Sequence, residues 1–107
     1  MPLIRIIDDV ASFRAPEAWG AREVAEIDGV SVRLHWTDKP YRWHVNDGTE
    51  VFVVLGGEVA MRYRQDGEER SVRLRPSDIF VAGEGEAHVA HPLGEARILV
   101  IERKGSD

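Results

Sequence analysis

Short runs in which apolar and polar residues alternate cover much of this 107-residue chain. Residues 30–36 read Val-Ser-Val-Arg-Leu-His-Trp, and residues 59–64 alternate in the same way. A period of two residues is typical of a β-strand with one buried face. The pair Asp66-Gly67 separates residues 59–64 from another alternating run at residues 71–75. Because both residue types tolerate positive φ, this pair predicts a β-hairpin.

Further extended segments follow, separated by turns that contain glycine or proline. We expect them at residues 50–55, 78–81, 87–90 and 97–102. A single helical turn is indicated only near residues 8–13, where Asp8 or Asp9 could cap it. Many short strands joined by Gly-rich turns are typical of an all-β sandwich or barrel. We therefore predict an all-β protein.

Length, charge and cysteine content narrow the function classes. The chain is long enough for one hydrophobic core, so we expect a single domain over residues 1–107. Its formal net charge of −5 disfavours general nucleic-acid binding, which needs a basic surface. The absence of cysteine excludes disulfides, thiolate metal sites and cysteine nucleophiles. No apolar run approaches the ~20 residues of a membrane span, and charged residues interrupt the first ten positions, so we expect a cytoplasmic protein.

Three side chains with metal-binding chemistry lie at the ends of predicted strands. His44 ends one extended segment, Glu50 begins the next, and His88 follows the Gly-rich loop 83–85. Two imidazoles and one carboxylate form a facial triad, which suits Fe(II), Mn, Ni or Zn and leaves coordination positions open. His91 lies three residues beyond His88 and would point to the opposite face of a strand, so we leave it out of the set.

The same region resembles the first sequence motif of the cupin superfamily. That motif reads His-x-His, three or four residues, Glu, six residues and Gly. This chain has His44-x-Asn46, three residues, Glu50, six residues and Gly57. Asn46 therefore stands where the family has its second histidine.

The second cupin motif is matched in part. It reads Gly, five residues, Pro-x-Gly, two residues and His. Gly85 and His88 are present at the expected spacing, whereas Ser77 and Gly83 replace the first Gly and the Pro. The phrase at residues 74–81, which precedes the matched glycine, also resembles the family segment that leads into this motif.

The resemblance implies a small jelly-roll barrel, or double-stranded β-helix, with a short N-terminal arm. It also implies a metal role for His44, Glu50 and His88, with Fe, Mn, Ni or Zn as the ion. The amide oxygen of Asn46 is a harder, neutral donor, which favours weak metal binding, a different metal or no metal at all. Since Asn followed by Asp-Gly is also good turn chemistry, we expect a turn role for Asn46 first and ligation second.

Two functions of different classes follow. The first is a metal-dependent enzyme, oxygenase-like or isomerase-like, that acts on a small molecule. The alternative is a non-catalytic cupin that binds or senses a small molecule with weak or no metal, and Asn46 favours this alternative. If the side chain of Glu50 points into the barrel, the alternation places Phe52, Met61 and Tyr63 on the inward side as well. These three are therefore the candidate pocket residues.

The run at residues 50–55 is apolar on both faces. If Glu50 faces inward, the outward face of this run consists of Val51, Val53 and Leu55. At ~25 cal/mol per Å², leaving three aliphatic side chains in water forgoes several kcal/mol. We expect a cover, either from the segment Leu3–Ile7 or from a second subunit through a two-fold interface. Small cupins commonly pair sheet to sheet, so the resemblance implies a homodimer.

Overall fold

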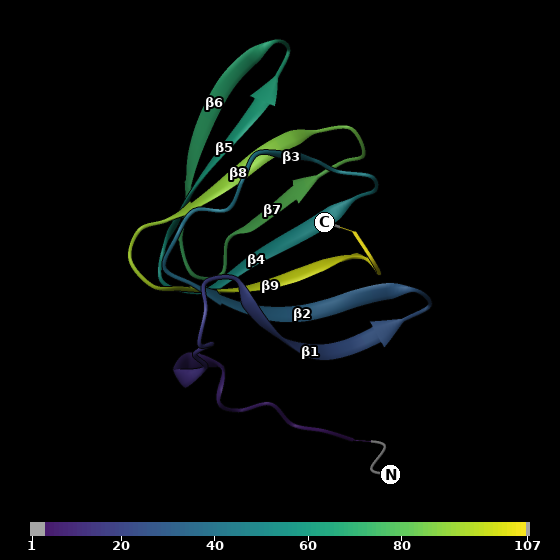
Figure 1. The fold of residues 1–107 in the computed structure, drawn as a ribbon, viewed down its shortest axis with the longest axis vertical. Helices are drawn as coiled ribbons and strands as arrows, with labels where there is room; N and C mark the ends of the chain where they lie inside the picture. The colour runs from purple at the N-terminus through teal and green to yellow at the C-terminus, as the bar shows by residue number, and fades with distance from the viewer. Residues whose placement is uncertain (1–3, 107) are drawn as a thin grey trace.

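A computed structural model describes residues 4–106 of the chain, as two antiparallel sheets packed against each other (Figure 1). Within these residues there is one 3-10 turn, η1 (Val10–Ser12), and no α-helix, so the all-β prediction is confirmed. The strands are β1 (Gly20–Ile27), β2 (Val30–Thr37), β3 (His44–Val45), β4 (Glu50–Gly56), β5 (Val59–Gln65), β6 (Glu68–Leu74), β7 (Ile79–Ala82), β8 (Ala87–Pro92) and β9 (Ala96–Arg103).

The strand order places segments that are distant in sequence next to one another. One sheet has the order β1-β2-β9-β4-β7, and the other has the order β3-β8-β5-β6. From β2 to β5 and again from β6 to β9, each strand therefore lies in the opposite sheet from the strand before it, as in a jelly roll. This topology brings the first residue of β4 opposite the paired strands β3 and β8 of the other sheet (Figure 1).

Two Asp-Gly pairs make the tight hairpins. Asp66 and Gly67 have φ values of 53° and 77° and join β5 to β6, which confirms the predicted hairpin. Asp28 and Gly29, with φ values of 49° and 80°, join β1 to β2 in the same way. Strand β1 was not predictable from the sequence, because charged residues weaken the alternation within Gly20–Ile27.

The N-terminal segment contains the expected helical turn, but not the expected cap. Asp9 occupies the N-cap position of η1 and makes no side-chain hydrogen bond there. Its carboxylate instead forms a salt bridge with Arg22 of β1, at 2.8 Å. The predicted capping role is therefore wrong, because the guanidinium offers this carboxylate a charged partner.

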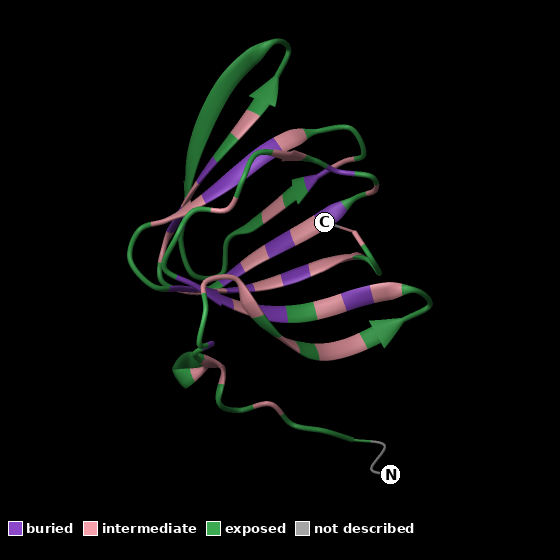
Figure 2. Ribbon diagram, viewed as in Figure 1, coloured by how far each residue is buried: buried purple, intermediate pink, exposed green. Residues whose placement is uncertain are grey.

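The core lies between the two sheets and follows the predicted inward phase of β4 (Figure 2). Glu50, Phe52 and Val54 are buried, and they alternate with more exposed residues. The main core cluster combines side chains from both sheets: Phe52, Val54, Val59, Met61, Leu74, Ala90, Ala96, Ile98 and Val100.

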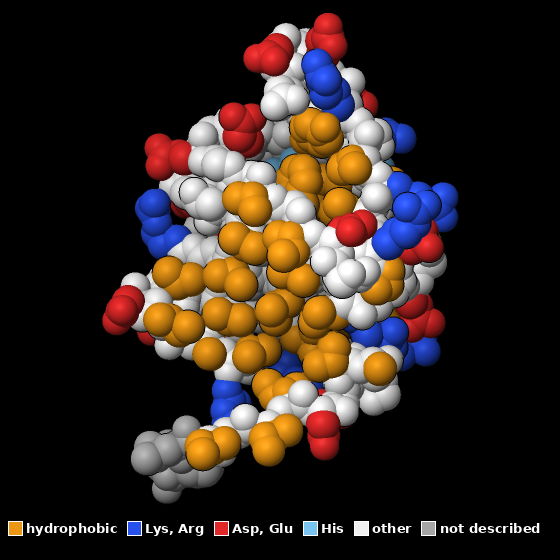
Figure 3. Space-filling model, turned by 180° about the vertical axis from the view of Figure 1, so that it is seen from behind, with side chains coloured by type: hydrophobic (Ala, Val, Ile, Leu, Met, Phe, Trp, Pro, Cys, Tyr) orange, Lys and Arg blue, Asp and Glu red, His pale blue; other side chains and the backbone are white. Residues whose placement is uncertain are grey.

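The outer face of the five-stranded sheet is also apolar, and Figure 3 shows hydrophobic side chains gathered over it. The part of this face over β7, β4 and β9 is referred to as its open part. There, neighbouring strands pair Val53 with Ile79, Val51 with Val81 and Val51 with Ile101. Near β2 this face is covered, because Arg97 donates a hydrogen bond to the carbonyl of Phe13 and Arg14 lies over the ring of Trp36.

The N-terminal arm covers this face only in part, because η1 lies beside β4 whereas the outer residues of β7 stay exposed. Ile4 and Ile6 are 81% and 82% exposed. Leu3, the first residue of the segment considered as a cover, lies outside the described residues. The outer residues of β7, Ile79 and Val81, remain 61% exposed within one chain.

Candidate metal site

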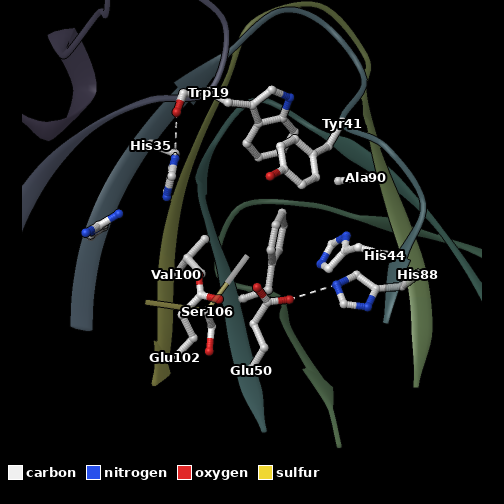
Figure 4. Close-up of a pocket in the computed structure, with 12 residues that line it drawn as sticks. Trp19, His35, Tyr41, His44, Glu50, His88, Ala90, Val100, Glu102 and Ser106 are labelled. Atoms are coloured by element: carbon white, nitrogen blue, oxygen red, sulfur yellow. Dashed lines mark hydrogen bonds and ion pairs between the residues drawn. The ribbon is translucent and has the colours of Figure 1, made fainter. Parts of the chain in front are cut away.

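His44, Glu50 and His88 converge between the two sheets (Figure 4). His44 of β3 and His88 of β8 are direct partners in the antiparallel ladder, and their rings lie 4.3 Å apart. Glu50 reaches them from β4 of the other sheet, and its Oε1 lies 2.7 Å from Nε2 of His88. One ligand atom from each residue lies within 4.8 Å of the others. The fold thus assembles a two-histidine, one-carboxylate donor set in a buried position.

The protonation chemistry of His44 suits a metal ligand. Its Nδ1 donates a hydrogen bond to the carbonyl oxygen of Arg42 at 3.2 Å, which leaves the lone pair on Nε2. That Nε2 is buried and has no partner among the described residues. Burial lowers the pKa of His44 below its usual value, so the ring is neutral at pH 7. A histidine held through one nitrogen, with a free lone pair on the other, has the usual arrangement of a metal ligand.

Asn46 is buried close to this cluster, but its amide is used by the protein itself. Its Nδ2 donates to the carbonyl of Ala82 at 3.3 Å, and Ala82 is the ladder partner of Glu50. Its backbone bonds Glu86 and Gly85 at 3.1 and 2.9 Å, so it fastens the β3–β4 loop to the β7–β8 loop. These contacts favour the structural role that the turn chemistry predicts.

A cavity of about 210 Å³ opens onto the cluster. Phe52, one of the three candidate pocket residues, lines this cavity. The two other candidate pocket residues lie elsewhere: Met61 is fully buried in the core, and Tyr63 borders a separate depression beside Phe80. Besides Phe52 and the three cluster residues, the cavity is lined by Trp19, Arg33, His35, Tyr41, Ala90, Val100, Glu102 and Ser106.

Three of these polar residues were not predicted from the sequence. Arg33 and His35 belong to β2 and Glu102 to β9, in the wall that faces the two histidines. The alternation of β2 was visible, but its apolar residues face the outer side of the sheet and its polar residues face the cavity. Glu102 ends an apolar run and gives no periodic signal. The pattern alone could not show which face of the sheet encloses the site.

Burial changes the ionisation of this wall. It raises the pKa of Glu102 from its ordinary 4.5 to about 7, and the neighbouring negative charge of Glu50 adds to this effect. Burial also lowers the pKa of His35, whose Nδ1 lies 3.0 Å from the carbonyl oxygen of Trp19. Both groups therefore favour their neutral forms more than they would in water.

Replacing Glu102 by glutamine should make stability less dependent on pH. A raised carboxyl pKa means that the native state binds more protons, so stability is highest below about pH 4.5 and falls as pH rises to about 7. For a half-buried group, solvent screening reduces the effect to roughly 1–2 kcal/mol. We expect Glu102→Gln to raise the melting temperature at pH 8 by about 5 °C and to change it little at pH 4.5. Thermal unfolding at both pH values measures this, and an equal shift at both would contradict it.

Replacing Asn46 by histidine should strengthen metal binding at some cost in stability. Imidazole is the better donor for Zn, Ni or Fe(II). The same change removes the hydrogen bond to Ala82, which is worth about 1 kcal/mol. We expect tighter Zn and Ni binding by calorimetric titration, together with a slightly lower melting temperature. Unchanged or weaker binding would mean that residue 46 points away from the ion.

Two antiparallel sheets around a His-Glu-His cluster define a jelly roll of the cupin type, and solved structures support this assignment. A cupin-2 domain protein from Shewanella frigidimarina superposes with a TM-score of 0.78, covering 95% of both chains at 24% identity. A cupin superfamily protein from Desulfitobacterium hafniense gives 0.77, covering 96% of this chain and 94% of that one at 18% identity. The chain therefore has the fold of these cupin proteins, as the motif resemblance implied.

Curated relatives extend the similarity to sequence. The 3-hydroxyanthranilate 3,4-dioxygenase of Mus musculus is 32% identical over 94 residues, which are 88% of this chain and 32% of that enzyme. The corresponding enzyme of Rattus norvegicus is 34% identical over 62 residues, 58% of this chain and 22% of the enzyme. The chain thus matches a third or less of the length of these relatives. No family model matches it.

One solved enzyme with this fold holds iron. The hydroquinone 1,2-dioxygenase PnpCD, in complex with Fe3+, superposes with a TM-score of 0.74 over 85% of this chain and 29% of that one, at 17% identity. In the described part of the present chain, no helix is long and apolar enough to cross a membrane.

Proposed function

We propose that this chain binds a divalent transition metal through His44, Glu50 and His88 and acts as an oxygenase on a small aromatic molecule. The observation that carries the proposal is the buried, unpartnered Nε2 of His44, which lies in a cluster whose ligand atoms are within 4.8 Å of one another. An uncompensated buried nitrogen is costly unless something binds it. A bound ion satisfies this atom and removes that cost.

A metal held by these three residues supplies a Lewis acid with open coordination positions. The chain's own residues provide the surroundings. His44 and His88 would each supply an imidazole nitrogen to the ion, and Glu50 would supply a carboxylate oxygen. Trp19 and Tyr41, with ring centroids 5.2 Å apart, line the same cavity as the cluster (Figure 4). Together with Phe52 they offer apolar ring faces to a bound molecule and exclude water from it.

The choice of an oxygenase over an isomerase rests on the relatives. The curated matches are 3-hydroxyanthranilate 3,4-dioxygenases, and one solved cupin with this fold is a hydroquinone 1,2-dioxygenase. Both names describe a dioxygenase of a phenolic compound. A phenol of one ring is also the size of molecule that a cavity of about 210 Å³ holds.

Metal analysis of protein purified without a histidine tag tests the proposal. We expect close to one Fe, Mn, Ni or Zn per chain, and oxygen uptake when iron-loaded protein meets 3-hydroxyanthranilate or hydroquinone. Metal without oxygen uptake would leave a metal-binding cupin that does not oxidise these phenols. No metal, even after incubation with excess ion, would overturn the proposal.

A second candidate function is binding without turnover. The amide of Asn46 is engaged with Ala82, so the protein supplies one imidazole fewer than the family motif. Weak metal affinity with tight binding of a small phenol would favour a sensor or accessory role.

The proposal includes a second copy of the chain. The outer face over β4, β7 and β9 is apolar, and the described part of the arm leaves its residues on β7 exposed. A two-fold axis can bring two such faces together, since an isologous interface needs only one self-complementary surface.

A further inference from the structure

The two histidines of the cluster differ in how their second ring nitrogen is held. Nδ1 of His44 donates a hydrogen bond to the carbonyl oxygen of Arg42 at 3.2 Å. Nδ1 of His88 is buried and has no partner among residues 4–106, and the side chain as a whole is only 2% exposed. A histidine that ligates a metal usually donates its other ring N–H to a carboxylate, a carbonyl or a water. The fold provides such an acceptor for His44 but not yet for His88.

Metal binding through His88 requires a change in the position of its proton. In the structure, Nε2 of His88 lies 2.7 Å from Oε1 of Glu50 (Figure 4). An ionised carboxylate only accepts hydrogen bonds, so this contact needs the proton on Nε2 and leaves the lone pair on Nδ1. A neutral His88 that ligates an ion through Nε2 carries its proton on Nδ1 instead. Nδ1 then becomes a buried donor, and a buried donor without an acceptor is costly.

Glu86 is a free carboxylate close to this nitrogen. A depression beside β7 is lined by both Glu86 and His88, which are two residues apart in the chain. The carboxylate of Glu86 is exposed and forms no hydrogen bond or ion pair with another described residue, so its side chain can change rotamer. Its backbone is held in place, because its carbonyl accepts from the N–H of Asn46 at 3.1 Å and its N–H donates to Gly83 at 3.2 Å.

The other polar side chains of this depression are weaker acceptors or none at all. Tyr63 and Gln65 are neutral, and a hydrogen bond to an ionised group is roughly twice as strong as one between neutral groups. Arg64 has no acceptor atom, and its guanidinium lies over the ring of Trp43 at 4.7 Å from the centroid. The chemistry of the depression therefore favours Glu86 as the partner of a donor.

We propose that Glu86 is a positioning residue of the metal site, whose carboxylate accepts the hydrogen bond from Nδ1 of His88. This contact fixes the orientation of the imidazole ring and makes Nε2 a more basic ligand. It also balances charge, because Glu50 alone leaves one positive charge of a divalent ion uncompensated. The inference rests on the proposed function, since it needs an ion at the cluster, but Glu86 is not itself a ligand.

The affinity of the full chain for zinc, measured by competition with a chelator, tests this role. We expect Glu86→Ala to weaken binding by 10- to 100-fold. Glu86→Gln keeps an acceptor oxygen without the charge, so its loss should be smaller. Glu84→Ala is the matched control, because Glu84 is exposed in the same loop but does not line the depression, and it should leave the affinity unchanged. Since Glu86 is exposed, the melting temperature of metal-free Glu86→Ala should equal that of the wild type.

Proton NMR of cobalt(II)-loaded protein gives a readout that a merely structural role would not move. The ring N–H of each ligand histidine produces a strongly shifted signal that disappears in D₂O. We expect two such signals in the wild type, one from His44 and one from His88. In Glu86→Ala the signal of His88 should shift or broaden through exchange with solvent. The signal of His44 should stay in place, because its acceptor is the carbonyl of Arg42.

Failure of this role and failure of the proposed function give different results. If Glu86→Ala binds zinc as tightly as Glu84→Ala, or if both NMR signals are unchanged, the positioning role is wrong although the metal site stands. A lower melting temperature of metal-free Glu86→Ala would overturn it in favour of a structural role. If the wild type binds no metal, the proposed function fails and the positioning role falls with it. Metal binding without oxygen uptake leaves the positioning role intact, because none of its tests depends on turnover.

Discussion

We expect His44→Ala and His88→Ala each to abolish the uptake of divalent metal by the purified protein. Each substitution leaves only two donors from the cluster, because ligand atoms of the three residues lie within 4.8 Å of one another in the present structure. Loss of a residue that merely supports a ligand typically costs 10- to 100-fold in metal affinity, so loss of a ligand should cost more than about 100-fold. Elemental analysis after dialysis against micromolar Zn, Ni or Fe(II) measures the result.

His91→Ala is the matched control for this experiment. His91 lies on β8, as His88 does, but it pairs with Ala60 in the ladder and does not line the cavity. Its replacement should leave the metal content unchanged. If His91→Ala removed metal as completely as His88→Ala, the assignment of the ligand set would be wrong. Melting temperatures of all three variants show whether any loss of metal follows from unfolding.

The predictable parts of the fold are those that depend on residues close together in the sequence. The Asp66-Gly67 hairpin was predictable because its turn needs two residues that accept positive φ, and both do so in the structure. Asp28-Gly29 carried the same signal, yet β1 was missed because its charged residues obscured the alternation. The pairing of β9 between β2 and β4 depends on contacts across more than 40 residues, which no local pattern records.

In the candidate site, too, some residues were predictable from the sequence and others were not. His44, Glu50 and His88 could be named because they occupy fixed positions in two motifs at strand ends. Arg33 and Glu102 could not be named from the sequence. The alternation showed that one face of β2 is apolar, but it did not show whether that face lies on the inner or the outer side of the sheet. In a jelly roll of this size, an apolar outer face and a polar inner face can occur on one strand. Arg33 and Glu102, which line the cavity, therefore could not be found from the periodicity.

The apolar outer face leads to the second large expected effect, on assembly. We expect the wild-type protein to elute with a mass near 24 kDa in light scattering, twice the 12.0 kDa of one chain. Burying a valine or isoleucine contributes about 1.5–3 kcal/mol relative to exposure, and several such residues lie on this face of each copy. Leu55, Ile79 and Val81 are its most exposed members on β4 and β7.

A charge on this face should separate the two copies. Val81→Glu changes a side chain that is 61% exposed within one chain, so the fold should tolerate it, whereas a dimer would have to bury an unpaired carboxylate. We expect this variant to fold with an unchanged circular dichroism spectrum and to elute near 12.0 kDa. Val45→Glu is the matched control, because Val45 is 64% exposed on β3 of the other sheet, and it should leave the mass near 24 kDa. A wild-type mass near 12.0 kDa at micromolar concentration would contradict the pairing. Dissociation by Val45→Glu but not by Val81→Glu would instead place the interface on the sheet that contains β3.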